Sequence, residues 1–233
     1  DPTALQTLTL NADGLNSSIT LGGNGSTVAA VGDAEGTAVL AILSSVSITA
    51  SNGATIDANG GFDSDAENAD INTQGDLTSL TISASGEGSV VEAPTLFADG
   101  DLVDTITYSA TDGARVDTDG DEAVMNYGFE SLVLETSGAA STLEAELVMD
   151  EGAITASAEA TISISAQGAG SVIDTEEGVF GAVDLDSLTV SVGSLASLTA
   201  TGQTDVEVDD DIGTIDINLD ANATFEGVLD IDA

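Results

Sequence analysis

The side chains available for chemistry in this 233-residue chain are almost all carboxylates. Asp and Glu number 42, Arg115 is the single basic residue, and His and Cys are absent. General-base catalysis by His, nucleophilic catalysis by Cys or Lys, and a zinc site of His or Cys ligands are therefore excluded. The remaining possibilities are acid–base catalysis by paired carboxylates, or the binding of a hard cation such as Ca²⁺, which takes oxygen ligands.

Several clusters of acids lie where the sequence indicates turns. The densest is Asp117-Thr-Asp119-Gly-Asp121-Glu122, in which Asp residues alternate around a Gly, as in loops that bring several oxygens to one Ca²⁺ ion. Its spacing departs from that of an EF-hand. The other predicted turn ligands are Asp63, Asp65 and Asp70; Asp99, Asp101 and Asp104; and Asp209, Asp210 and Asp211. A solvated, charged turn is the alternative for each cluster.

These acids are carried on an internal repeat of the pattern apolar-x-small-apolar-x-apolar. Its eight copies start at residues 5, 43, 77, 103, 129, 159, 185 and 212. A second apolar element follows each start by 13 or 14 residues, and a looser third element follows the second. Each element alternates apolar and polar residues, which is typical of a strand with one buried face.

The repeat predicts an all-β chain folded as a parallel β-helix, or β-solenoid, of about eight coils with three short strands per coil. One coil cannot bury its own apolar side, so stacking on neighbouring coils must stabilise the rod. We expect one solenoid domain over residues 1–233, with an excursion loop around 59–72. The alternative is an antiparallel β-sandwich, which the constant offset between the two elements disfavours.

Stacking turns each repeat position into a column of side chains about 4.8 Å apart. The residue after the central apolar residue of the second element is acidic in six of the eight units, and alternation predicts that it points outward. Two such charges repel by about 3 kcal/mol at an effective dielectric constant of 20. Either solvent and salt screen the column, or Ca²⁺ bridges it. The predicted ligands of this column are Asp57, Glu92, Asp117, Glu144 and Asp174.

The net charge of −41 restricts the partners. Nucleic-acid binding is excluded because neutralising phosphates requires many Lys or Arg residues, and an anionic membrane surface would repel the chain. No membrane insertion is expected, because the longest apolar run, 38–43, is too short to span a bilayer. No signal peptide is visible and the chain does not begin with Met, which favours a mature or excised product.

Three copies of the repeat, Leu77-Thr-Ser-Leu-Thr-Ile82, Phe129-Glu-Ser-Leu-Val-Leu134 and Leu185-Asp-Ser-Leu-Thr-Val190, are each followed by a Gly- or Ala-rich turn. In this style of repeat, in its absence of Cys and in its near absence of basic residues, the chain resembles the β-helical, calcium-dependent surface-layer proteins and RTX-type adhesins of Gram-negative bacteria. The RTX nonapeptide G-G-x-G-x-D is absent; 60–63 and 100–104 hold only fragments of it. The resemblance implies a secreted structural protein, extracellular or on the cell surface, that Ca²⁺ orders.

We therefore expect a non-enzymatic protein that assembles with copies of itself as a surface-layer or filament subunit, with cell-surface glycans as further partners. The alternative is a segment of a calcium-dependent adhesin. A polysaccharide-acting β-helix enzyme would use acids such as those at 209–211, but it would need basic residues to hold anionic sugars. An ice-binding solenoid would need a flat Thr-x-Thr array, and the pairs Thr7/Thr9, Thr105/Thr107 and Thr199/Thr201 are too scattered to predict one.

Overall fold

The structure is a computed structural model in which every element is a β-strand, among the residues that it describes. None of those residues forms a helix long and apolar enough to cross a membrane. The described residues are 7–22, 45–60, 71–73, 77–92, 96–98, 102–117, 123–125, 128–144, 147–149, 160–175, 180–199 and 206–226.

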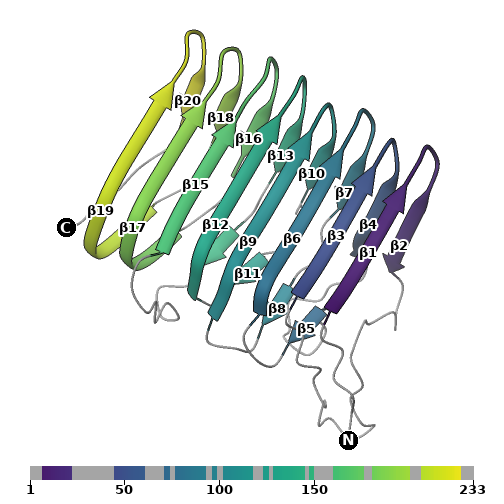
Figure 1. Ribbon diagram of the computed structural model, residues 1–233, viewed down its shortest axis with the longest axis horizontal. Coiled ribbons are helices and arrows are strands. Elements are labelled where there is room, and N and C mark those ends of the chain that lie inside the picture. The colour runs from purple at the N-terminus through teal and green to yellow at the C-terminus, as the bar shows by residue number, and fades with distance from the viewer. Residues whose placement is uncertain are drawn as a thin grey trace, which may run out of the picture.

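The first layer is an eight-stranded parallel sheet, here called the long-strand sheet (Figure 1). Each strand pairs with the equivalent strand of the next repeat unit, so the strand order follows the chain. Its strands, in order, are β1 (Thr7–Asp13), β3 (Ser45–Ser51), β6 (Leu77–Ser85), β9 (Leu102–Thr111), β12 (Gly128–Ser137), β15 (Ala160–Ala166), β17 (Phe180–Val192) and β19 (Val206–Leu219).

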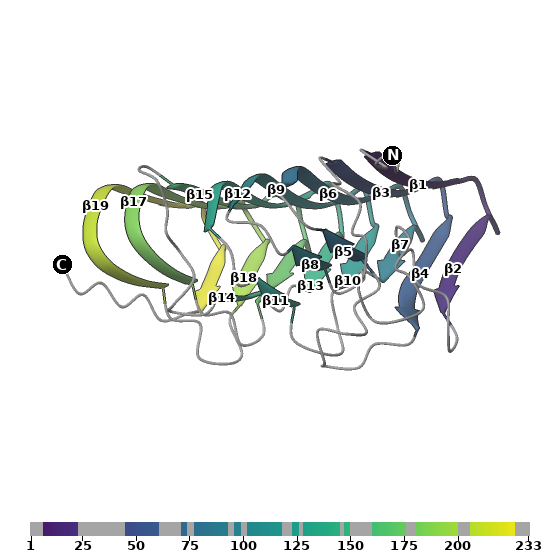
Figure 2. The ribbon, with the colours of Figure 1, turned by 90° about the horizontal axis from the view of Figure 1, so that it is seen from below.

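The second layer, the short-strand sheet, is also parallel and eight-stranded and is built from the second element of each unit. Figure 2 shows it on the opposite side of the molecule from the long-strand sheet. All pairings in both sheets are parallel, so the chain is a β-solenoid and the antiparallel sandwich is excluded. Its strands are β2 (Ser18–Gly22), β4 (Thr55–Gly60), β7 (Val90–Glu92), β10 (Arg115–Asp117), β13 (Thr142–Glu144), β16 (Val172–Asp174), β18 (Ser197–Thr199) and β20 (Thr224–Glu226).

The third element forms separate strands only in the middle of the described chain. There β5 (Ile71–Thr73) pairs with β8 (Leu96–Ala98), and β11 (Ala123–Met125) pairs with β14 (Leu147–Met149). The ends of the predicted excursion loop, 59–60 and 71–72, are strand residues of β4 and β5, and 61–70 lie outside the described residues.

Eight uniform coils of three short strands are therefore not what the structure shows. In the sixth and seventh units the third element runs directly into the long-strand sheet, as the first residues of β17 and β19. The two strands pair with a register shift between Ala182 and Asp184, a bulge of the kind that bends a strand. Figure 2 shows both strands curving around the side of the rod.

The core lies between the two sheets and follows the alternation of the sequence. In β3 the burial pattern alternates from residue to residue, and Val46, Ile48 and Ala50 are fully buried. The six inner strands of the short-strand sheet each contribute one buried apolar residue, such as Ile56 and Val91, and the edge strands β2 and β20 contribute the partly buried Ile19 and Phe225. The same columns continue through the stack, so each coil covers the apolar side chains of the next.

The turn that joins the two sheets occurs in two lengths, which accounts for the offset of 13 or 14 residues in the sequence. Two residues before the buried apolar residue of the short strand, the longer turn has Ser and the shorter turn has Ala. The residues at this position are Ser17, Ala54, Ser89, Ala114, Ser141, Ser171, Ala196 and Ala223.

The Ser hydroxyl completes the hydrogen bonding of the longer turn. Ser141 Oγ donates to the carbonyl oxygen of Ser137 at 2.7 Å and accepts from the backbone N–H of Gly113, in the preceding coil, at 3.0 Å. Ser89 makes the equivalent pair of bonds, to Ser85 and from Gly53. One side chain thus closes its own turn and ties it to the shorter turn beside it.

Candidate functional site

The predicted column of acids lies across the outer side of the short-strand sheet. The pairing register places one equivalent residue from each strand of this sheet in a single row across the strands. Its five central members, named here the acidic column, are successive carboxylates at the strand spacing of about 4.8 Å. The aligned residues are Thr20, Asp57, Glu92, Asp117, Glu144, Asp174, Thr199 and Glu226.

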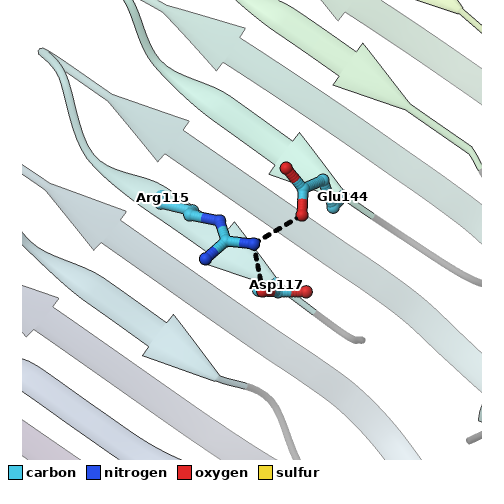
Figure 3. A network of polar contacts seen from close by, with 3 residues as sticks. All are labelled: Arg115, Asp117 and Glu144. Atoms are coloured by element: carbon cyan, nitrogen blue, oxygen red, sulfur yellow. Dashed lines mark hydrogen bonds and ion pairs between the residues drawn. The ribbon is translucent and has the colours of Figure 1, made fainter. Parts of the chain in front are cut away.

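The single basic residue of the chain lies in the middle of this column (Figure 3). Arg115 is the first residue of β10, and its Nη2 is 2.5 Å from Asp117 Oδ2 and 2.6 Å from Glu144 Oε2. One guanidinium thus pairs with carboxylates on two adjacent strands. The hydrogen bond to Glu144 and the charge of Asp117 raise the pKa of Arg115, so the group is a permanent cation at this point.

Asp117 is more buried than its position predicts. We expected an outward, solvated carboxylate, but the residue is 5% exposed, whereas its neighbours Glu92 and Glu144 are partly exposed. A carboxylate can stay charged in such a place only if it is paired. Arg115, two residues earlier on the same side of the strand, supplies that charge.

At Glu92, burial and neighbouring charges both favour the protonated carboxyl. Its pKa is raised, first by desolvation and then by the charges of Asp57 and Asp117, while Arg115 acts in the opposite direction. A hydrogen bond between the Glu92 and Asp57 side chains also favours the protonated form. The column can therefore lower its energy by taking up a proton or another cation.

Most residues of the turn clusters predicted to bind a metal lie outside the described residues. Asp104 lies in β9, and Asp209, Asp210 and Asp211 lie within β19 rather than in the predicted turn, because that strand continues through its bulge. In the described part of the chain, no three acidic side chains converge on one point as an ion site requires. The cluster members outside the described residues are Asp63, Asp65, Asp70, Asp99, Asp101, Asp119, Asp121 and Glu122.

Sequence reasoning did not assign a role to Arg115 in the site. The signal was present in the repeat, because aligning the units puts Arg115 two residues before an acid of the column, on the same side of a strand. The partner on the next strand, Glu144, follows from the same alignment once the strands are known to be parallel.

Comparisons of the chain with protein families, with characterised proteins and with solved structures find no match.

Proposed function

We propose that the protein is a structural subunit, not an enzyme, that assembles end to end with copies of itself outside the cell. The observation that supports this is the edge of the long-strand sheet at β19, which no other described strand covers. Within the described residues β19 pairs only with β17. Its side chains Ile215, Ile217 and Leu219 are 39%, 40% and 51% exposed, whereas the residues paired with them on β17 are buried.

The other edge of the same sheet offers the complementary surface. On β1, Leu10 and Ala12 occupy the repeat positions of Ile217 and Leu219, and Leu10 is only partly buried. A second copy that pairs its β1 with β19 would continue the parallel ladder and cover the exposed side chains. Such a contact joins two different surfaces, so it leaves a free edge at each end and extends into a filament or lattice.

Calcium is the second part of the proposal. Copies that carry 42 acids and one base repel one another, and the acidic column already favours the uptake of positive charge. We propose that Ca²⁺ at the Asp-rich turns orders the rod, in which each repeat unit forms one coil. The resemblance to surface-layer proteins and RTX-type adhesins supports a secreted, cell-surface location, where other copies and surface glycans are the partners.

The test compares assembly of the purified chain with CaCl₂ and with a chelator at matched ionic strength, by light scattering and electron microscopy. We expect ordered assemblies that dissolve on chelation. Ile217→Glu should prevent assembly because it puts a charge on the bare edge. Leu195→Glu is the matched control, since Leu195 is equally apolar and 60% exposed but lies in a turn.

Two results would contradict the proposal. A stable monomer in both conditions would contradict self-assembly and favour an adhesin segment. Assembly that is indifferent to Ca²⁺ would contradict the calcium part alone.

A further inference from the structure

The outer side of the long-strand sheet carries a regular array of hydroxyl groups. The pairing register aligns two rows of residues, two positions apart, across all eight strands; these rows are named the hydroxyl face. The first row is Thr7, Ser45, Ser79, Thr105, Ser131, Thr161, Ser187 and Thr214. The second row is Thr9, Ser47, Thr81, Thr107, Val133, Ser163, Thr189 and Asp216.

The hydroxyl face is almost free of charge on a chain of net charge −41. Fourteen of its 16 residues are Ser or Thr and only Asp216 is charged, whereas six of the eight aligned residues on the opposite sheet are acidic. Strand propensity accounts for Thr but not for the many Ser residues. A need for solubility does not explain the face either, because acidic residues would make the protein more soluble than Ser and Thr do. The segregation of charge indicates a surface with a separate task.

The parallel register makes this face a regular lattice. Side chains recur at about 4.8 Å across the strands and at about 7 Å along them. Figure 1 shows the eight strands lying side by side, and Figure 2 shows them edge-on as one layer. Hydrogen bonds across strands help to orient the hydroxyls. Ser45 Oγ, in the first row, lies 2.9 Å from Ser79 Oγ. In a third row, two residues beyond the second, Ser83 Oγ donates to Thr49 Oγ1 at 3.1 Å.

We propose that the hydroxyl face binds the surface of ice. A hydroxyl both donates and accepts hydrogen bonds, as water does, so a rigid lattice of hydroxyls can hold a layer of water in the order that a crystal face continues. Charged groups would instead orient water around themselves. A crystalline polysaccharide is the competing ligand, but the two rows contain no aromatic side chain for a sugar ring to stack on.

The Thr-x-Thr pairs themselves are scattered, as expected, and the regularity of the hydroxyl face comes from Ser and Thr together. Thr7/Thr9 and Thr105/Thr107 occupy the same two rows, and Ser completes the rows in the units between them. Thr199 belongs to the other sheet. This inference goes beyond the proposed function and does not depend on self-assembly.

The test is the growth of single ice crystals in solutions of the purified chain, with thermal hysteresis and crystal shape as readouts. We expect faceted crystals and a measurable hysteresis gap for the wild type. Thr107→Tyr, in the middle of the face, should abolish most of the gap because the ring disrupts the lattice. Thr199→Tyr makes the same change at an outward position of the short-strand sheet and should keep the wild-type gap.

Ser163→Tyr, two strands away from Thr107, is a second disrupting variant if the first does not fold, and circular dichroism shows which variants keep the β-sheet spectrum. Rounded crystals without hysteresis in the wild type would overturn the proposal. So would equal activity of folded Thr107→Tyr and Thr199→Tyr chains, or retention on chitin or cellulose powder without any effect on ice.

Discussion

At the scale of single residues, Arg115 is the one side chain that offsets the charge of the acidic column. It lies between two strands of acids and pairs with Asp117, whose side chain is 7% exposed, and with Glu144, whose side chain is 37% exposed. The pair to Asp117 therefore matters more for stability, since water screens the pair to Glu144 more strongly.

Arg115→Gln should lower the free energy of unfolding by about 1–3 kcal/mol, because it leaves the buried carboxylate of Asp117 without its cation. Urea unfolding followed by circular dichroism measures the change. The double variant Arg115→Gln/Asp117→Asn should recover part of the loss, because the two changes are coupled. If Arg115→Gln unfolds like the wild type, the ion pair does not stabilise the column.

Glu92 links the same column to pH. Its pKa in the folded protein is above the usual 4.5, so the folded state binds more protons than the unfolded chain between that value and the raised pKa. Stability therefore falls as pH rises through this window. Glu92→Gln should raise the melting temperature at neutral pH and bring it closer to that of the wild type as the pH is lowered toward 4.5.

The comparison for Glu92→Gln is Glu87→Gln, which removes an acid from an exposed turn of the preceding segment. The difference between the two variants separates the effect of the column from the general effect of one charge fewer. Equal pH profiles for the two would show that Glu92 is not the group whose burial and neighbours couple stability to pH.

At the scale of elements, the turns between the two sheets have sequence features that the alternation of apolar residues does not predict. Two turn lengths stack on one another, and the Ser or Ala two residues before the short strand distinguishes them. At Gly168 the stacking is so close that a Cβ would overlap the backbone carbonyl of Gly138 in the turn of the preceding coil, and both glycines have positive φ angles. Turn length and residue choice are therefore coupled between neighbouring coils.

Ser141→Ala should lower the free energy of unfolding by about 1–3 kcal/mol, because it leaves the carbonyl of Ser137 and the N–H of Gly113 without their shared partner in a buried place. Ser194→Ala is the control, since Ser194 lies in the shorter form of the turn between the same two sheets and is exposed. Thermal and urea unfolding of both variants would decide the matter, and equal stabilities would mean that the hydroxyl is replaced by water.

At the scale of the whole molecule, the solenoid separates three kinds of surface. One sheet presents acids, the other presents hydroxyls, and the edge strand β19 presents apolar side chains. Because each coil touches only its neighbours, each outward column can change its chemistry without changing the core. The proposed ice binding and end-to-end assembly therefore use different surfaces, and variants in one should leave the other intact.

The sequence by itself determined the all-β class, the parallel stacking, the columns of buried side chains and the acidic column. These follow from local alternation and from the regular return of the same pattern, as at 77–82, 129–134 and 185–190. The absence of Lys, His and Cys likewise needs no structure. The residues of the acidic column were predictable because one position in each unit is enough to define a column.

Only the tertiary structure showed which side chains of neighbouring columns lie close together and how deeply each is buried. The burial of Asp117, the bond from Arg115 to Glu144 and the alignment of Thr107 with Ser47 all join residues far apart in the chain. Their proximity depends on the register of the strands, which the turn lengths set. The merging of the third element into β17 and β19 depends on a bulge between neighbouring strands, and the local pattern of apolar residues carries no sign of it.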